Sequence, residues 1–298
     1  MMKEKRVLVT GASGMVGNYA PQVFGECHLM LTDIEHAPYS LDIRDRHAVR
    51  QAVGDFKPEF VLHLGAATDV DRCEEEPEWA YKTNVSGTEN VARACVEFDA
   101  TLVYVSTAAV FSGDKNEPYS EDDVAKPANL YGRSKLEGEH YVSSVLRRYY
   151  IVRAGWMIGG GRKDKKFVGK IAQFINEGRQ NLKAVDDKIG TPTYARDLLE
   201  GIKKLIDTDC YGTYHMGNSG FCTRYDIAVA ITKILNRSDV SVLPVDSSQF
   251  TLSAPRGQSE ALLNMKLDSM KIHRMRSWQD ALRSYLLDEL MPALQSQD

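Results

Sequence analysis

The feature that most constrains this chain is a glycine-rich turn close to its N-terminus. A short apolar, β-branched run from Arg6 to Thr10 leads into it and is typical of a buried strand. Gly11, Gly14 and Gly17 follow at intervals of three, and a helical pattern comes next. Gly11 permits a sharp turn, Gly14 lets backbone N–H groups approach a phosphate, and Gly17 lets the helix pack closely on its strand. The stretch predicts a strand–turn–helix unit that binds the pyrophosphate of a dinucleotide.

The spacing of these glycines is G-x-x-G-x-x-G, which differs from the G-x-G-x-x-G fingerprint, so an ordinary glycine-rich turn is the alternative. A second residue supports dinucleotide binding. The run from His28 to Thr32 reads as the next strand and ends at Asp33, roughly 20 residues past the glycines. A carboxylate there accepts hydrogen bonds from an adenosine ribose and repels a 2′-phosphate, which favours NADH. A plain aspartate that caps its loop is the alternative.

Short apolar runs alternate with longer amphipathic patterns over residues 1–155. This alternation predicts an α/β fold with a doubly wound parallel sheet, the Rossmann arrangement. The freely turning Gly159-Gly160-Gly161 is the best boundary between lobes. Residues 156–298 then form a smaller C-terminal α/β lobe that mainly binds substrate, with segments returning to the sheet. Further strands are predicted at 60–64, 102–105, 150–154, 213–216 and 240–245, and helices at 45–56, 76–98, 167–177, 194–206, 225–235 and 278–287.

Composition and charge argue against several classes of function. A formal net charge of −4 without a basic stripe argues against nucleic acid, and the cations of 162–166 read as a solvated loop. No apolar stretch approaches the roughly 20 residues of a membrane span, and the first strand starts too early to leave room for a signal peptide. The five cysteines, at 27, 73, 95, 210 and 222, are odd in number and lack metal-ligand spacing. We therefore expect reduced thiols, no metal site and a cytoplasmic protein.

A tyrosine and a lysine four residues apart supply the candidate chemistry. Tyr131 and Lys135 fall in a helical pattern, where this spacing places side chains on one face. A neighbouring ammonium stabilises phenolate, so we expect a lowered tyrosine pKa, which suits an acid that protonates a carbonyl near neutral pH. Thr107, just past the 102–105 strand, adds a hydroxyl that orients the substrate oxygen. Because Tyr-x-x-x-Lys pairs are common on ordinary helices, this inference depends on the glycine turn and Asp33.

Two further positions in the first lobe bear on the site. Gly65-Ala66-Ala67-Thr68 follows the 60–64 strand, and its small residues let backbone pass close to a ligand, although they also suit close packing of a helix on the sheet. Asn84 lies inside the predicted 76–98 helix, where an amide competes with the backbone for hydrogen bonds. It is either a structural bridge or exposed.

Together these residues resemble the extended short-chain dehydrogenase/reductases, and most closely the dTDP-4-dehydrorhamnose reductase family, over nearly the whole chain. Several segments carry the closer likeness. They are Leu41 to Asp45, Thr68 to Glu74, Tyr131 to Glu139, Arg153 to Trp156, Val185 to Thr193 and Gly212 to His215. The resemblance implies reduction of a 4-keto nucleotide-diphosphate sugar with NADH or NADPH, with Thr107, Tyr131 and Lys135 as the catalytic trio. A homodimer is compatible with it.

The same resemblance implies which residues hold the ligands. The implied cofactor contacts are Gly11, Ser13, Gly14, Met15, Val16, Gly17, Asp33, Asp42, Ile43, Ala66, Ala67, Tyr131 and Lys135. The implied substrate contacts are Thr68, Val70, Thr107, Trp156 and Arg256. A core position for the large ring of Trp156 and a solvated loop cation at Arg256 are the alternatives.

Two departures from the family pattern leave the sugar open. Ala108-Ala109 stands where the family has Asp-Tyr, and Arg256 follows Pro255 rather than preceding a proline. The alanines also argue against a 4,6-dehydratase, which carries Asp-Glu there, whereas a 4-epimerase uses the same trio and stays open. A different class stays open as well, because the regulatory subunit of methionine adenosyltransferase resembles these reductases and acts as a binding partner.

Overall fold

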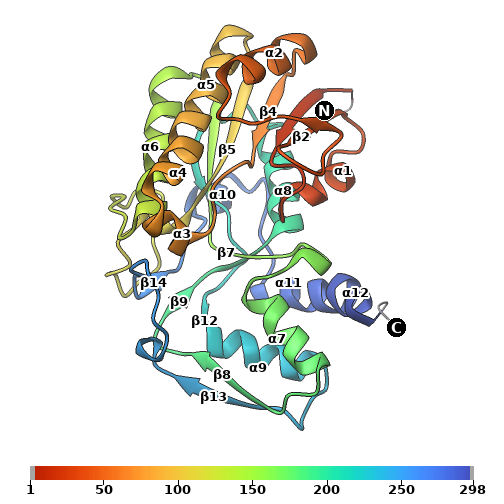
Figure 1. Cartoon of the computed structure of the whole chain (residues 1–298), viewed down its shortest axis with the longest axis vertical. Helices are drawn as coiled ribbons and strands as arrows, with labels where there is room; N and C mark the ends of the chain where they lie inside the picture. Colours follow the sequence, from red (N-terminus) through yellow and green to blue (C-terminus); the bar gives the residue numbers. More distant parts are fainter. Residues whose placement is uncertain (1–3, 296–298) are drawn as a thin grey trace.

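A seven-stranded parallel sheet forms the upper part of the molecule in Figure 1. The computed structural model describes residues 4–295. Its strands lie in the order β11 (Gly212–His215), β6 (Tyr149–Ala154), β5 (Thr101–Thr107), β4 (Phe60–His63), β1 (Arg6–Thr10), β2 (His28–Asp33) and β3 (Tyr39–Ser40). This arrangement confirms the predicted doubly wound fold. It also includes β11, which comes late in the chain and pairs in parallel with β6.

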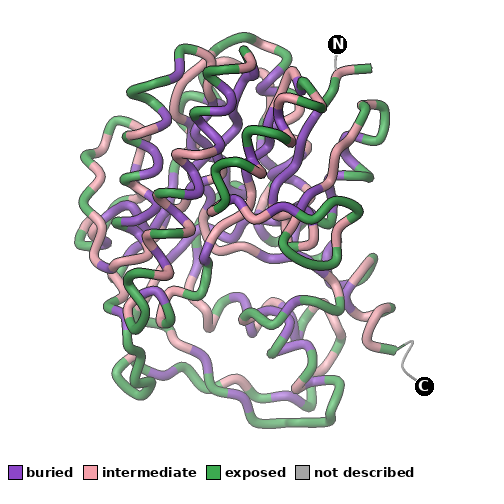
Figure 2. Tube along the Cα trace, turned by 45° about the horizontal axis from the view of Figure 1, so that its top comes forward, coloured by how far each residue is buried: buried purple, intermediate pink, exposed green. Residues whose placement is uncertain are grey.

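The central strand β1 shows why helices cover both faces of the sheet. Val7 and Val9 are buried in one apolar cluster and Leu8, between them, in a second cluster, because successive side chains of a strand point to opposite faces. The first cluster includes residues of α1 (Ala20–Val23) and α8 (Ala195–Leu205), and the second includes residues of α2 (Arg46–Phe56), α5 (Thr88–Glu97) and α6 (Leu130–Val145). Figure 2 shows the buried residues concentrated in this layered part.

Two helix predictions need correction. The helix after the glycine turn is only a 3₁₀ turn, Gly17–Tyr19, followed by the four-residue α1. The predicted 76–98 helix is divided into α4 (Pro77–Tyr81), a π-helical segment (Lys82–Gly87) and α5. Such π turns are rare and occur often at functional sites, and this one carries Asn84.

Three small sheets and several helices form the lower part of the molecule in Figure 1. β7 (Trp156–Ile158) pairs with β10 (Pro192–Tyr194), directly after the end of β6. The second sheet places β9 (Ile189–Gly190) between β12 (Cys222–Thr223) and β14 (Ser259–Glu260), and the third joins β8 (Asn181–Val185) to β13 (Ser241–Val245). α7 (Phe167–Asn176) and α9 (Arg224–Ile234) pack beside them.

The remaining helices are short. They are α3 (Val70–Glu75), α10 (Met265–Met270), α11 (Trp278–Tyr285), a π-helical turn (Leu286–Leu290), α12 (Met291–Gln295), and 3₁₀ turns at Ala108–Val110, Gly161–Lys163 and Ser247–Gln249. Within residues 4–295, no helix combines the length and the apolar character needed to cross a membrane. The same range contains no cluster of side chains suited to a metal ion.

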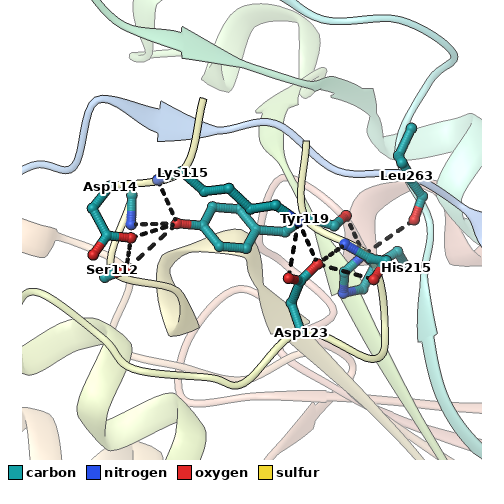
Figure 3. Close-up of polar contacts among 9 residues, drawn as sticks. Ser112, Asp114, Lys115, Tyr119, Asp123, His215 and Leu263 are labelled. Carbon is teal, nitrogen blue, oxygen red and sulfur yellow. Dashed lines mark hydrogen bonds and ion pairs between the residues drawn. The ribbon is translucent and has the colours of Figure 1, made fainter. Parts of the chain in front are cut away.

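The long loop after β5 is fixed by Tyr119 (Figure 3). Its hydroxyl accepts hydrogen bonds from the Gly113 and Lys115 backbone N–H groups, at 3.0 and 3.2 Å. Its backbone N–H donates to the Ala261 carbonyl, and its carbonyl accepts from the Leu263 N–H, each at 2.8 Å. These two bonds hold the segment that follows β14 against the loop, and so bring β14 to the carboxyl end of the large sheet.

Candidate active site

The glycine turn has the geometry that the sequence predicts for it. Gly11 has a φ of +70°, and a Cβ there would lie 2.6 Å from the Gly65 nitrogen. A Cβ at Gly17 would collide with the Gly11 carbonyl oxygen. Within residues 4–295, the backbone N–H groups of Met15 and Val16 donate no hydrogen bond. The turn therefore presents free donors beside a surface without side chains, which fits a pyrophosphate.

Asp33 lies beside this turn, at the end of β2. One carboxylate oxygen accepts the Ser13 backbone N–H at 2.9 Å and the other accepts the Ile34 N–H at 2.7 Å. The Ser13 hydroxyl donates to the Glu35 carbonyl oxygen at 2.9 Å. The structure thus fixes a half-buried carboxylate against the loop, where a negative charge would face the ribose of a bound dinucleotide.

Four further residues that the resemblance implies as cofactor contacts, Asp42, Ile43, Ala66 and Ala67, lie after strands β3 and β4. The carboxylate of Asp42 accepts a forked pair of hydrogen bonds from the Arg44 guanidinium, which lowers the pKa of Asp42. Ile43 is buried, and its side chain fills the space where a Cβ at Gly87 would sit. Ala66 and Ala67 follow β4 in the neighbouring loop, with Ala67 buried. The ion pair leaves Arg44 neutralised rather than free to bind a phosphate.

The catalytic trio comes together at the carboxyl end of β5. Thr107 ends that strand, and Tyr131 and Lys135 lie on the first turns of α6, where Asn129 caps the helix by accepting the Gly132 N–H. The Thr107 side chain is near enough to the Tyr131 phenol to lower its pKa. The Lys135 ammonium donates to the Val105 carbonyl oxygen at 3.0 Å and lies 4.0 Å from the centre of the Tyr104 ring.

The expectation that Lys135 lowers the tyrosine pKa is wrong for this unliganded state. Burial raises the pKa of Tyr131 to about 12, and the Thr107 side chain only partly opposes it. Burial also lowers the pKa of Lys135 to about 7, against the opposing charge of Glu139. The physical reason is desolvation, which disfavours both the phenolate and the ammonium.

The predicted substrate residues fall on two sides of the trio. Thr68 is exposed just past β4, and Val70 begins α3. Arg256 lies across from them on the loop before β14, and its guanidinium forms an ion pair with Asp71 at 3.0 Å and donates to the Ala254 carbonyl oxygen at 2.9 Å. This pair links the loop to α3, so Arg256 is a partnered cation rather than a free one.

Trp156 is covered on both sides of its ring. The Arg224 guanidinium lies 3.8 Å from the ring centre, and Gly190 packs so closely that a Cβ there would collide with the indole. The indole N–H donates to the Glu260 carboxylate. Trp156 is half-buried and follows β6, whose Ala154 is the register partner of Thr107. The ring is therefore close to the trio but does not offer it a bare aromatic face.

With this geometry established, comparison with known proteins identifies the family. The model of the RmlD substrate binding domain matches residues 5–291. The chain belongs to this family. It is 34% identical to the spore coat polysaccharide biosynthesis protein SpsK of Bacillus subtilis over 94% of this chain and 96% of that protein. It is 33% identical to the dTDP-4-dehydrorhamnose reductase of Mycolicibacterium smegmatis over 94% and 84% of the two chains.

A solved structure of another dTDP-4-dehydrorhamnose reductase is similar to this chain over nearly its whole length. The dTDP-4-dehydrorhamnose reductase of Bacillus anthracis, solved in complex with NADP, superposes with a TM-score of 0.90 at 35% identity. The match covers 96% of this chain and 99% of that one. These values agree with the fold and the family inferred from the glycine turn and the trio.

Sequence reasoning missed the hydrogen bonds that hold this RmlD-family site together. The Asn84 side chain accepts the Ala67 N–H at 2.8 Å and donates to the Ala67 carbonyl and the Ser134 hydroxyl at 3.1 and 3.0 Å. Asn84 is therefore a bridge from the loop after β4 to α6. His63 extends the chain of contacts, since its two ring nitrogens face the hydroxyls of Thr10 and Thr88 at 2.7 and 3.1 Å. Burial lowers the pKa of His63 to about 3, so the ring is neutral.

Proposed function

We propose that this protein reduces the keto group of a 4-keto nucleotide-diphosphate sugar with NADH or NADPH, and that dTDP-4-dehydrorhamnose is the first substrate to test. The observation that carries the proposal is that Thr107, Tyr131 and Lys135 gather at the carboxyl end of β5, the same edge of the parallel sheet at which the glycine turn follows β1, in an RmlD-family chain. The names of the relatives support the substrate class.

Each member of the trio has a role in this proposal. Tyr131 donates its phenolic proton to the carbonyl oxygen as negative charge develops there, and Thr107 hydrogen-bonds the same oxygen. A bound nicotinamide cofactor supplies the hydride. Lys135 holds the ribose next to the nicotinamide and, when protonated, stabilises the phenolate that Tyr131 becomes. A lysine with a pKa of about 7 can change its charge near neutral pH, which suits this role.

The ligand contacts complete the proposal. The glycine turn residues, Gly11 to Gly17, hold the pyrophosphate, and Asp33 holds the adenosine ribose. Asp42, Ile43, Ala66 and Ala67 lie along the remaining cofactor surface. Thr68, Val70 and Trp156 border the sugar. We divide these tasks between a dinucleotide-binding region, 1–155, and a mainly substrate-binding region, 156–298.

The proposal also covers the cellular compartment and the oligomeric state. Cys73, Cys95, Cys210 and Cys222 are free thiols, which is usual in a reducing compartment and supports a cytoplasmic protein. A homodimer is the assembly to test first, because closed two-fold dimers are the commonest oligomers. Light scattering on the purified protein would measure it.

The proposed function is tested by following NADH and NADPH oxidation with a panel of 4-keto nucleotide sugars. The expected result is oxidation with dTDP-4-dehydrorhamnose, and none with dTDP-glucose, which has no keto group. Cofactor binding without turnover of any keto sugar would contradict the proposal and would favour a regulatory binding protein. Sugar interconversion without net cofactor oxidation would indicate an epimerase.

A further inference from the structure

Arg224 is an arginine without a partner. Among residues 4–295 it forms no hydrogen bond and no ion pair, although it is not exposed. Every other arginine in that range outside the exposed class has a carboxylate partner: Arg44, Arg148, Arg153, Arg196, Arg237 and Arg256. Removing a guanidinium from water without pairing it is costly, so a half-buried cation of this kind is an expected sign of a missing anion.

The surrounding elements hold this guanidinium in one place. It lies 3.8 Å from the Trp156 ring centre and 5.1 Å from that of Phe167, distances at which a cation is attracted to an aromatic face. Gly190 supports the opposite side of Trp156. Arg224 comes two residues after Cys222, which pairs with Gly190 across β12 and β9. The position is therefore built by strand pairing rather than by a flexible loop.

Carboxylates act on this region through their charge, but none of them forms an ion pair with Arg224 among residues 4–295. Glu260, the nearest carboxylate acting on Arg224, already accepts the Trp156 indole N–H and forms no ion pair with Arg224. Lys166 adds a second positive charge. Burial lowers the pKa of Lys166, the charge of Asp164 opposes this, and the charge of Arg224 lowers the pKa further. Burial lowers the pKa of Arg224 to about 10, so it remains charged at neutral pH.

Glu260 and Trp156 relate this cation to the proposed catalytic trio. Glu260 raises the pKa of Tyr131 through its charge, which places it within electrostatic range of the phenol. Trp156 follows the strand position beside Thr107. Glu260, which contacts Trp156, therefore acts through its charge on both Tyr131 and Arg224.

We propose that the Arg224 guanidinium, presented on the face of Trp156, binds the diphosphate of the nucleotide-sugar substrate and so positions the sugar against Tyr131. The inference rests on the proposed function and assigns its anion contact. Arg256, which the sequence suggested for this role, already has Asp71 as its partner. A guanidinium suits a diphosphate because its parallel N–H groups hold two oxygens at once.

The test is calorimetric titration of the NADP⁺-loaded protein with dTDP and with thymidine. Arg224→Met keeps an apolar stem against Trp156 and removes the charge. We expect it to weaken dTDP binding roughly tenfold to a hundredfold, the range for losing a charge-assisted hydrogen bond. Thymidine and NADP⁺ affinities should stay unchanged, and Arg224→Lys should recover part of the loss.

The matched control is Arg179→Met. Arg179 also stacks on an aromatic ring, 3.9 Å from the centre of Phe174, but it is exposed and pairs with Glu177 at 3.4 Å. This variant should bind dTDP like the wild type. If Arg224→Met does not fold, Arg224→Lys is titrated with dTDP in its place. An unchanged dTDP affinity and an unchanged substrate KM in Arg224→Lys would contradict the proposal.

The outcomes separate this inference from the proposed function. Unchanged dTDP affinity in Arg224→Met, in a wild type that reduces the keto sugar, would overturn the inference alone. Unchanged dTDP affinity in Arg224→Met, together with a higher KM for a substrate whose sugar bears a carboxylate, would indicate that Arg224 contacts the sugar and not the diphosphate. That result would also overturn the inference. A wild type that neither binds dTDP nor oxidises NAD(P)H would overturn both.

Discussion

The cofactor side and the substrate side of this site are assembled in different ways. On the cofactor side, Gly11 to Gly17 and Asp33 lie close in sequence, at the carboxyl ends of the adjacent strands β1 and β2. On the substrate side, Trp156 contacts Arg224 and Glu260, and Glu260 is 104 positions away. A local motif specifies the first side, whereas only the pairing of β12, β9 and β14 creates the second. Motif residues are therefore readable from the sequence, and residues brought together by packing are not.

The largest expected effect concerns the chemistry on which both sides converge. Tyr131→Phe keeps the ring and removes the proton donor, so turnover of dTDP-4-dehydrorhamnose should fall by roughly two to four orders of magnitude, the usual range for loss of a general acid. NADPH affinity, measured by fluorescence titration, should survive. Tyr141→Phe, on the same helix α6, is the matched control. Near-normal turnover in Tyr131→Phe would show that another group is the acid.

The second-largest expected effect concerns Asn84, which bridges the loop after β4 and helix α6. Asn84→Ala leaves the buried Ala67 N–H without its acceptor and the Ser134 hydroxyl without one of its partners. The free energy of unfolding in urea should fall by about 1–3 kcal/mol, the penalty for an unsatisfied buried polar group. The exposed Asn181→Ala should change it by less than about 0.5 kcal/mol. Equal effects of the two substitutions would mean that Asn84 does not bridge the loop and α6.

Much of the fold follows from sequence patterns because each strand and helix has its own period. Six of the seven strands of the large sheet, β11 included, were predicted to within a few residues, whereas the two-residue β3 was not predicted because it is too short to show a pattern. The division of the 76–98 helix was not predicted. The π-helical segment carries Asn84, whose side chain bonds to Ala67 in a loop 17 positions away. Spacing in one segment carries no information about such a partner.

The candidate site divides in the same way. The positions of Thr107, Tyr131 and Lys135 follow from a strand end and a helical spacing. The pKa of Tyr131 does not, because burial comes from the whole fold and reverses the expected shift. The ion pair between Arg256 and Asp71 could not be predicted from the sequence either, because the two residues are 185 positions apart. Since Arg256 has this partner, we assign the diphosphate contact to Arg224.

A pH series tests the burial of Lys135. Its pKa in the folded protein, about 7, lies below its ordinary value of 10.5. Between these values the unfolded chain holds the proton and the folded protein does not, so the free energy of unfolding should rise with pH from pH 7 upward. One such group contributes at most about 1.4 kcal/mol per pH unit. Lys135→Met should flatten this rise, and parallel curves for the two proteins would contradict the assigned burial.

The smallest expected effect concerns cofactor choice. Asp33→Asn removes the negative charge that faces the 2′ position and keeps one acceptor oxygen, which can serve either the Ser13 or the Ile34 N–H group at its present place. The ratio of NADPH to NADH affinity should rise about fivefold, since two unit charges about 4 Å apart in water interact by about 1 kcal/mol. Fluorescence titrations of both cofactors measure it. An unchanged ratio would mean that Asp33 does not face the 2′ position.

The central claim is that the two sides form one active site for reducing a 4-keto nucleotide sugar. The most direct measurement supplies reduced nicotinamide cofactor carrying deuterium at both C4 positions, with dTDP-4-dehydrorhamnose as substrate, and locates the label by NMR. The account predicts that deuterium appears at C4 of the product sugar, one per cofactor oxidised. A product without deuterium at that carbon, or a cofactor that stays reduced, would contradict it.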